Sequence, residues 1–332
     1  MRRTFTFDEV ALVPQFNNIP SRTEPNLESW LTRARRVSVP LVAANMDTVI
    51  GPELAELLIA NGTTPIFHRF ADHETQKSWV RRFGDRMFIS SGLGDLDKLR
   101  ELLELGAAGA CIDVAHGHSD KMMAFIGELK RSHPEHEVIA GNICSAMAYH
   151  DLVNAGADAV KVGIGPGAAC TTRMITGFGV PQFSAISECA TVAEKLRVPM
   201  IADGGIRGSR DIVIALAAGA STVMIGKLFA LTEESAADKR GGDVREAKYR
   251  GQASEDFQTD FYGGLKEYTV AEGIDFWAPV SGSAQSLIDD LMGGLRSGMT
   301  YGGARNLKEL QRKAEFVEVG PGYATESAPR QG

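Results

Sequence analysis

One cysteine of this chain lies in a glycine-rich loop that suits nucleophilic chemistry. The loop reads GIGPGAACTTRMITGFG over residues 163–179, and two threonines directly follow Cys170. Glycines let a backbone turn tightly and aim its amides or carbonyls inward, and nearby backbone dipoles stabilise a thiolate. We therefore predict that Cys170 attacks an electron-poor carbon, with Thr171 or Thr172 as a hydroxyl relay. The structural alternatives are a small core residue and a local backbone cap.

The other cysteines and two histidines give weaker signals. The remaining cysteines form no C-x-x-C pair and no metal-ligand spacing, so we interpret them as core residues in a chain whose thiols stay reduced. His116 and His118 have no cysteine or carboxylate pattern around them, and we interpret them as polar loop residues and not as zinc ligands. Asp113, just before them, is a better candidate for a ligand hydroxyl. The remaining cysteines are Cys111, Cys144 and Cys189.

A second glycine-rich stretch, IADGGIRGSRDIVIALAAGASTVMIGKLF over residues 201–229, predicts a phosphate site. Glycine amides beside a helix N-terminus bind phosphate well, and the Asp203 carboxylate can accept hydrogen bonds from two ribose hydroxyls. The structural alternative is that the glycines only form tight turns between strand and helix. The glycines in question are Gly204, Gly205 and Gly226.

These residues follow short apolar runs that alternate with helical patterns. The eight runs start 21 to 28 residues apart, except for one gap of 41 residues that contains the Cys170 loop. Apolar runs that alternate with amphipathic helices indicate a parallel sheet. Eight such units predict a closed (β/α)8 barrel, or TIM barrel, with its active site at the carboxyl ends of the strands. The runs are VPLVAA (39–44), TPIFHR (64–69), RMFIS (86–90), GACIDVA (109–115), EVIAGN (137–142), DAVKVGI (158–164), PMIADGG (199–205) and STVMIG (221–226).

The rest of the chain extends this barrel. Residues 232–280, after the eighth run, are rich in Gly, Glu, Asp and Lys and are interpreted as a flap over the site. We predict a single barrel domain over residues 1–320 and a disordered tail over residues 321–332. Helix ends fit this scheme: Gly106, Gly156 and Gly219 suit C′ positions before strands, and Ser145 and Ser209 suit N-caps.

Composition excludes several classes of partner. The net charge of −7 is spread in both signs, so neither nucleic acid nor a membrane surface is an expected partner. No stretch approaches 18 apolar residues, and the N-terminal MRRTFTFDEVALVP lacks the apolar core of a signal peptide. We expect a cytoplasmic protein that holds a small anionic ligand through local dipoles.

Read together, seven segments resemble the IMP dehydrogenase/GMP reductase family. The resemblance covers nearly the whole chain, and the cysteine loop is its most specific part. It implies the (β/α)8 barrel already inferred, usually as a homotetramer. The segments are AANMDTV (43–49), CIDVAHGHS (111–119), IAGNICS (139–145), VKVGIGPGAACTTR (160–173), IADGGIR (201–207), VMIGKLF (223–229) and LMGGLRSGMTYGGARNLKEL (291–310).

The flap resembles the reductase branch of this family. IMP dehydrogenases usually insert two regulatory domains after the second strand, and the stretch between TPIFHR and RMFIS is too short for them. Dehydrogenases also hydrolyse their intermediate with an Arg-Tyr pair in the flap, and no such dipeptide occurs between residues 232 and 280. The flap reads GQASEDFQTDFYGGLKEYTVAEG (251–273), which is similar to the reductase pattern; FHRF (67–70) and DVAHGHS resemble a bacterial subgroup.

The resemblance implies NADPH-dependent reductive deamination of GMP to IMP and ammonia. Cys170 would add to carbon 2 of the purine, ammonia would leave with proton help from Thr172 and Glu272, and hydride would reduce the thioimidate. A reductase must keep water from this intermediate, so it needs no Arg-Tyr base. An IMP dehydrogenase without regulatory domains, a reductase of another purine nucleotide, an inactive nucleotide-binding protein and a flavin-dependent barrel are the alternatives.

The resemblance also implies binding residues. Arg69 would pair with the extra phosphate of NADPH, against the alternative of a solvated surface arginine. The substrate residues would be Asn45, Met46, Asp203, Gly204, Gly205, Gly226, Lys227, Gly251, Gln252 and Ala253. The cofactor residues would be Ser21, Arg22, Arg69, Asp113, Val114, Ala115, Ile164, Gly165, Ser297, Gly298, Met299 and Thr300, the last four from a neighbouring subunit. The backbone carbonyls of Gly165, Gly167 and Cys170 resemble the family's potassium site.

Three features depart from the family pattern. Ala168 stands where a phosphate-binding serine is usual, and Lys227 stands where serine or glycine is usual. A lysine beside a phosphate could replace the lost hydroxyl through a charge-assisted hydrogen bond; the alternative is a lysine turned to solvent. Thr269 and Ala271 replace the arginine and serine of the reductase flap, which leaves the flap's own ligand contacts open.

Overall fold

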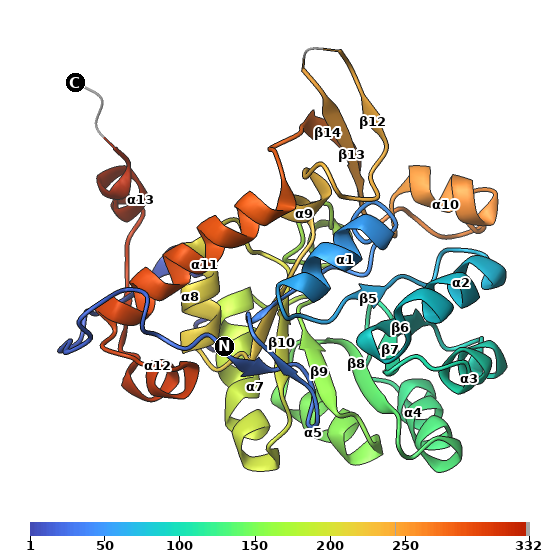
Figure 1. The fold of residues 1–332 in the computed structure, drawn as a ribbon, viewed down its shortest axis with the longest axis horizontal. Helices are drawn as coiled ribbons and strands as arrows, with labels where there is room; N and C mark the ends of the chain where they lie inside the picture. Colours follow the sequence, from blue (N-terminus) through green and yellow to red (C-terminus); the bar gives the residue numbers. More distant parts are fainter. Residues whose placement is uncertain (243, 330–332) are drawn as a thin grey trace.

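A parallel sheet of eight strands forms the centre of the computed structural model, which describes residues 1–242 and 244–329. Its order is β4-β11-β10-β9-β8-β7-β6-β5, and each strand overlaps one of the eight apolar runs, so the predicted (β/α)8 barrel is confirmed (Figure 1). Within the described residues no ladder joins β4 to β5, so the barrel is nearly closed. The strands are β4 (Leu41–Ala43), β5 (Ile66–Phe67), β6 (Phe88–Ser91), β7 (Gly109–Asp113), β8 (Glu137–Ile143), β9 (Ala159–Val162), β10 (Met200–Asp203) and β11 (Thr222–Ile225).

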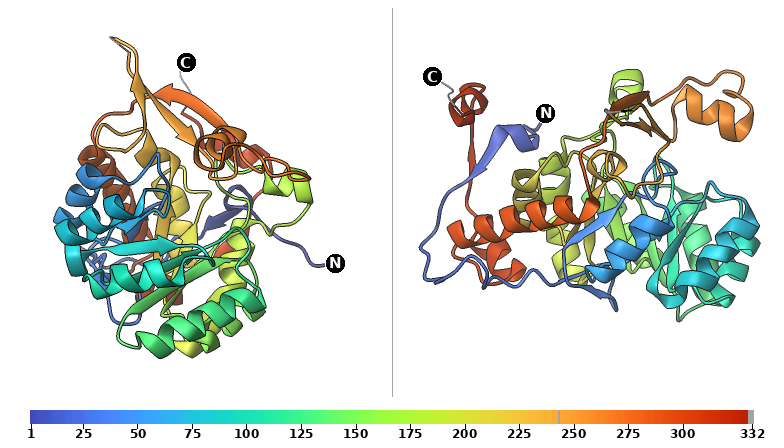
Figure 2. Two further views of the ribbon diagram at one scale, coloured as in Figure 1. Left: turned by 90° about the vertical axis from the view of Figure 1, so that its right-hand side faces the viewer. Right: turned by 45° about the horizontal axis from the view of Figure 1, so that its top comes forward.

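Helices cover the outside of this sheet (Figures 1 and 2). The strands are buried on both faces, as expected for a parallel sheet between an inner and an outer layer. None of the helices in residues 1–242 and 244–329 combines the length and the apolar character needed to cross a membrane. The covering helices are α1 (Pro52–Ala60), α2 (His73–Phe83), α3 (Leu96–Glu104), α4 (Asp120–Ser132), α5 (Ala146–Ala155), α7 (Gln182–Leu196), α8 (Ser209–Ala217), α11 (Ala284–Tyr301) and α12 (Leu307–Lys313).

Most of the expected helix ends are present. Gly156 ends α5 in the left-handed region, at φ 118°, and the Ser145 hydroxyl caps the start of the same helix. The prediction for Ser209 was wrong, because α8 already begins at Ser209 and its N-cap is Gly208. The side chain of Ser209 instead packs against Gly294 of α11, where an added Cβ would meet it at 2.3 Å.

The flap predicted over residues 232–280 is a small antiparallel sheet with one helix. Strands β12 (Lys239–Arg240), β13 (Glu246–Arg250) and β14 (Asp275–Pro279) pair side by side, and α10 (Glu255–Tyr262) lies between the last two in the chain. The sheet stands above the barrel at the top of Figure 1. Residue 243 lies outside the described residues.

The two ends of the chain meet beside the barrel. Strand β1 (Val10–Leu12) pairs with β15 (Phe316–Glu318), and β2 (Ser29–Trp30) pairs with β3 (Arg36–Val37). In the segment predicted as a disordered tail, the structure has a short helix, α13 (Gly322–Ser327), and the ring of Tyr323 lies 5.6 Å from the guanidinium carbon of Arg210. Residues 330–332 of that tail lie outside the described residues. Short 3-10 helices, η1 and η2, occur at Phe7–Glu9 and Gly84–Arg86.

Candidate active site

The three predicted catalytic residues form one chain of contacts. Cys170 is exposed in the loop after β9, and Thr172 begins the short helix α6 (Thr172–Thr176). The Cys170 thiol donates to the Thr172 Oγ1 atom at 3.3 Å, and the Thr172 hydroxyl donates to the Glu272 carboxylate at 2.7 Å. The arrangement provides a path for a proton from the thiol, through the hydroxyl, to a carboxylate of the flap.

Main-chain hydrogen bonds hold Glu272 in this position. The amide of Thr171 donates to the Glu272 carbonyl at 2.9 Å, and the amide of Ile274 donates to the Ala169 carbonyl at 2.9 Å. On the flap side, the Glu272 amide donates to the Ala253 carbonyl at 3.0 Å. The segment around Glu272 is therefore fixed between the cysteine loop and the rest of the flap.

Two glycines make this close approach of three backbones possible. A Cβ atom at Gly251 would lie 2.9 Å from the Ala169 carbonyl oxygen, and one at Gly273 would lie 3.0 Å from the same oxygen. Both distances are too short for a side chain without displacement of the backbone. Gly251 was predicted as a substrate residue, and the structure gives it and Ala253 a further role in seating the flap.

A buried arginine fastens the base of the flap to the barrel. Arg250, at the end of β13, is 8% exposed and donates to Asp47 at 2.6 and 2.9 Å. The same guanidinium contacts Asp256 and Asp260 at the start and end of the α10 region. Burial raises the pKa of Asp47, and the charge of Arg250 opposes this rise. Asp47 directly follows the predicted base-binding residues, so this ion pair joins the flap to that loop.

A cavity of about 310 Å³ opens between the cysteine loop, the ends of β10 and β11, and the flap. The volume is within the range of small-molecule sites. Most of the predicted substrate residues line it together, although they come from three separate parts of the chain. They are Met46, Asp203, Gly204, Gly205, Gly226 and Lys227.

Three glycines that line this cavity are packed closely against neighbouring residues. Gly204 and Gly205 have φ of 93° and 82°, and a Cβ atom at Gly204 would lie 2.9 Å from Pro166. Gly226 precedes the short helix α9 (Lys227–Ala230), and a Cβ atom there would lie 2.6 Å from the Tyr249 hydroxyl. A side chain at Gly204 or Gly226 would therefore displace Pro166 or Tyr249, which line the same cavity.

The opposite end of the site is built by the flap and the loop after β4. Asn45 is buried, donates to the Ser90 hydroxyl at 2.9 Å, and accepts at its carbonyl from the Gln252 side chain at 3.0 Å. The Tyr249 hydroxyl lies 3.7 Å from the Met46 sulfur. Lys227 is exposed, and its ammonium lies 5.4 Å from the centre of the Phe276 ring in the flap.

Two residues of the site were missed by the sequence analysis. Tyr249 is almost fully buried and lines the cavity from the flap. Lys161 is buried in β9, and its ammonium bonds to Asp113 at 2.7 Å and Asp203 at 2.9 Å. The available signal was a single charged residue in the apolar run DAVKVGI, because a lysine in a fully buried strand requires carboxylate partners.

The predicted cofactor residues of the barrel lie at or directly after the ends of β5, β7 and β9. Asp113 ends β7 and carries the ion pair with Lys161, and Val114 exchanges main-chain hydrogen bonds with Gly141 and Asn142. Arg69 stacks on Phe70, and its Nε atom is buried without a hydrogen-bond partner. The remaining members are Ala115, Ile164 and Gly165, and the Ile164 carbonyl accepts from the side chain of Arg173.

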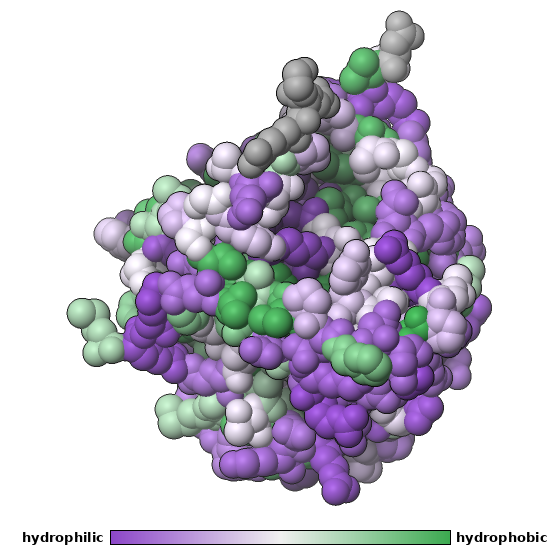
Figure 3. Space-filling view, turned by 90° about the vertical axis from the view of Figure 1, so that its left-hand side faces the viewer, coloured by the Kyte–Doolittle hydropathy of each residue, from purple (hydrophilic) through white to green (hydrophobic). Residues whose placement is uncertain are grey.

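The second group of predicted cofactor residues lies elsewhere on the chain. Arg296, just before Ser297 in α11, donates to the carbonyls of Thr23 and Pro25, so the segments 21–22 and 297–300 are neighbours. Figure 1 shows the carboxyl end of α11 at the left and β5 at the right. The surface seen from that left side is mostly hydrophilic (Figure 3). Because the carboxyl end of α11 and β5 lie on different sides (Figure 1), one chain does not bring the two groups of predicted cofactor residues together.

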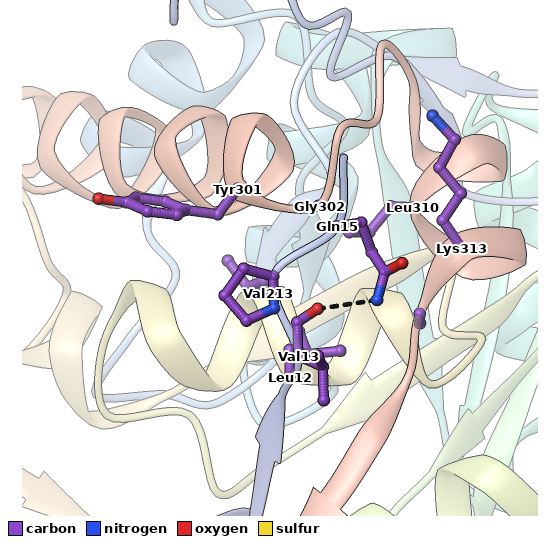
Figure 4. A pocket seen from close by; sticks show the side chains of 11 residues that line it. Leu12, Val13, Gln15, Val213, Tyr301, Gly302, Leu310 and Lys313 are labelled. Atoms are coloured by element: carbon purple, nitrogen blue, oxygen red, sulfur yellow. Dashed lines mark hydrogen bonds between the residues drawn. The ribbon is translucent and has the colours of Figure 1, made fainter. Parts of the chain in front are cut away.

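Packing inside the chain accounts for two residues of this second group of predicted cofactor residues. Met299 is fully buried, and a Cβ atom at Gly298 would lie 2.6 Å from Val213 of α8. Gly298 also lines a second, smaller cavity of about 120 Å³, beside Tyr301 and Gln15 (Figure 4). This cavity is mainly apolar and separate from the one at Cys170.

Metal binding by side chains has no support in the described residues. Within residues 1–242 and 244–329 no group of three or more His, Cys, Asp or Glu side chains is placed to hold a metal ion. His118 bonds to Asp151 at 2.9 Å, as expected for a polar loop residue. Among the carbonyls predicted for potassium, that of Gly167 accepts a hydrogen bond from the Cys170 amide at 3.0 Å.

Brief treatment with iodoacetamide is expected to label Cys170 before the other cysteines. Cys170 is exposed, whereas Cys111 and Cys189 are fully buried, and burial raises the pKa of Cys111 to about 12. Peptide mass spectrometry after timed quenching measures the order, and Cys170→Ala should remove the rapidly labelled peptide. Labelling of Cys111 or Cys189 first, in folded protein, would contradict this arrangement.

Comparisons with known proteins show the family to which the chain belongs. The IMP dehydrogenase / GMP reductase domain matches residues 4–330. GMP reductase 2 of Homo sapiens is 36% identical over 328 residues, which is 94% of this chain and 93% of that protein. GMP reductase of Yersinia enterocolitica is 36% identical over 330 residues and 94% of each chain. Inosine-5'-monophosphate dehydrogenase of Aquifex aeolicus is 48% identical over 238 residues, which is 70% of this chain and about half, 49%, of that protein. The chain belongs to the IMP dehydrogenase/GMP reductase family.

Proposed function

We propose that this protein is a GMP reductase, which converts GMP to IMP and ammonia with NADPH. The contact chain from Cys170 through Thr172 to Glu272 is the observation that carries the proposal. It joins a nucleophile, a hydroxyl and a flap carboxylate at the edge of a cavity lined by the predicted nucleotide residues. The full-length similarity to GMP reductases supports the same reaction.

The proton path follows from the contacts of the three residues. As the Cys170 sulfur bonds to carbon 2 of the purine, its proton passes through the Thr172 hydroxyl to Glu272. Glu272 then returns a proton to the amine, and the carbon–nitrogen bond breaks. Ammonia departs, and the purine remains bonded to Cys170 as a thioimidate. When bound, NADPH supplies the hydride for carbon 2. Cys170 leaves as a thiolate and is reprotonated.

The barrel residues fit the rest of this proposal. Asp203 would take the ribose hydroxyls, and the glycine amides with Lys227 would take the phosphate. Arg69 suits the extra phosphate of NADPH, because its Nε atom is buried without a partner. We further propose a potassium ion on the carbonyls of Gly165, Gly167 and Cys170, a homotetramer in which a neighbour supplies Ser297, Gly298, Met299 and Thr300, and a cytoplasmic location.

Two observations support rival activities. The high identity to a dehydrogenase, over 70% of this chain, favours oxidation of IMP. Ala168 and Lys227, which stand where the family usually has other phosphate-binding residues, favour another purine nucleotide. A nucleotide panel with both nicotinamide cofactors separates these possibilities.

A spectrophotometric assay is expected to show NADPH oxidation that depends on GMP. Cys170→Ala should abolish turnover and still bind GMP, because it removes only the sulfur that forms the adduct. Mass spectrometry of trapped enzyme should detect the adduct on Cys170. Steady NADH formation from IMP and NAD, without GMP-dependent oxidation of NADPH, would replace the proposal with a dehydrogenase.

Glu272→Gln is expected to lower kcat about 10²- to 10⁴-fold, with the KM for GMP nearly unchanged, because the amide cannot exchange the proton. The matched control is Glu267→Gln, an exposed carboxylate of the same flap. Steady-state kinetics measure both variants. Equal rates for Glu272→Gln and wild type would exclude Glu272 from proton transfer.

Lys227→Ala is expected to raise the KM for GMP roughly tenfold, since a charge-assisted hydrogen bond to phosphate is lost. The value of kcat should change little, because Lys227 lies at the nucleotide cavity and not in the contact chain of Cys170. Lys266→Ala, at an exposed position of the flap, is the control. An unchanged KM would indicate that the lysine points to solvent.

A further inference from the structure

Lys161 is a buried charge at the centre of the site that the proposed reaction does not use. Its side chain is 2% exposed on β9, inside the barrel. The ammonium lies 2.7 Å from the Oδ1 atom of Asp113 and 2.9 Å from the Oδ2 atom of Asp203. One cation therefore bridges β7 and β10, the strands that supply the predicted cofactor residue Asp113 and the predicted ribose-binding residue Asp203.

The surroundings leave Lys161 few other partners. The Met224 sulfur lies 3.9 Å from the ammonium, and the buried thiol of Cys111 and the buried hydroxyl of Tyr249 are titratable groups near these charges. Asn142 donates to the same Asp203 oxygen at 2.9 Å. Burial alone would lower the pKa of Lys161, but the charges of Asp113 and Asp203 outweigh it and raise the pKa above its ordinary value.

The two carboxylates serve different halves of the site. Asp203 lines the nucleotide cavity, and Asp113 is not among the residues that line it. Lys161 contacts one oxygen of each, which leaves the other oxygen of each for a ligand hydroxyl.

We propose that Lys161 is a positioning residue that couples the two halves of the site. It holds the carboxylates of Asp113 and Asp203 aimed at their ligands, and because they share one ammonium, a change at either alters binding at the other. The identity of the two ligands rests on the proposed function. The coupling itself rests on the ion pairs of Lys161.

Because Asp113 and Asp203 share the ammonium of Lys161, the direction of the change in nucleotide affinity follows. If Asp113 loses its charge, Lys161 pairs with Asp203 alone and neutralises it more fully. Asp203 then becomes a weaker acceptor for the ribose hydroxyls, so nucleotide affinity falls although Asp113 does not line the cavity. We expect Asp113→Asn to weaken GMP binding, measured without NADPH, by about threefold to tenfold.

A double-mutant cycle tests this coupling. Isothermal titration with GMP compares wild type, Asp113→Asn, Lys161→Met and the double variant. In the Lys161→Met background, Asp113→Asn should no longer weaken GMP binding, because the connecting charge is gone. Additive effects, or a GMP affinity that Asp113→Asn leaves unchanged, would overturn the proposal. If Lys161→Met does not fold, the result for Asp113→Asn alone decides.

The control variant is Lys130→Met. Lys130 also pairs with an aspartate, Asp158, at 3.0 Å, but at the opposite ends of the strands. Its removal should lower thermal stability and leave GMP affinity unchanged. If Lys161 had a purely structural role, Lys161→Met would behave like Lys130→Met. Fewer molecules would be active, and the affinity of the active molecules for GMP would be unaltered. Weakened binding of both GMP and NADPH by correctly folded Lys161→Met is the result that a structural role does not give.

A ligand-free measurement separates this inference from the proposed function. Lys161→Met should lower the midpoint of thermal unfolding by about 5–15 °C, because two half-buried carboxylates lose their cation. Adding Asp113→Asn should recover part of this loss, whereas Asp113→Asn alone should not stabilise the protein. If wild type binds no GMP, the proposed function fails, and the cycle is run with the purine nucleotide that does bind. Absence of any recovery would show that the three charges are not linked.

Discussion

Two main-chain hydrogen bonds hold the flap against the cysteine loop, and the catalytic contacts depend on them. The Thr171 amide donates to the Glu272 carbonyl, and the Ile274 amide donates to the Ala169 carbonyl. The flap therefore pairs with the backbone of the cysteine loop. A thiol and a carboxylate far apart in the chain are thereby kept within reach of one hydroxyl. Backbone bonds of this kind fix position without a specific side chain, which leaves Glu272 free for proton transfer.

The flap needs a second attachment, because a short antiparallel sheet is marginally stable alone. Arg250 provides it through Asp47, directly beside the loop that ends β4. The flap and this loop are therefore joined twice, because the side chain of Gln252, two residues beyond Arg250, donates to the carbonyl of Asn45 in the same loop. A nucleotide base in contact with that loop would also stabilise the seated flap, and the flap completes the site only when seated.

Local sequence patterns predicted the barrel and the nucleophile, because their signals lie within a few residues. The apolar runs mark the strands, and the glycines around Cys170 mark its loop. Glu272 was found only through family resemblance, since its contact with Thr172 spans 100 residues. Lys161 was missed because its two partners lie on other strands, and Ser209 was taken for a cap because its packing on Gly294 is a tertiary contact.

The exposure of Cys170 limits how this site can work. A thioimidate in contact with water would be hydrolysed to the product of a dehydrogenase, so a reductase must shield it. The lone chain does not provide that shield: Cys170 is exposed, and the apolar side chains of Met174 and Phe178 in the same loop are 86% and 78% exposed. Water must therefore be excluded by what binds beside the thiol.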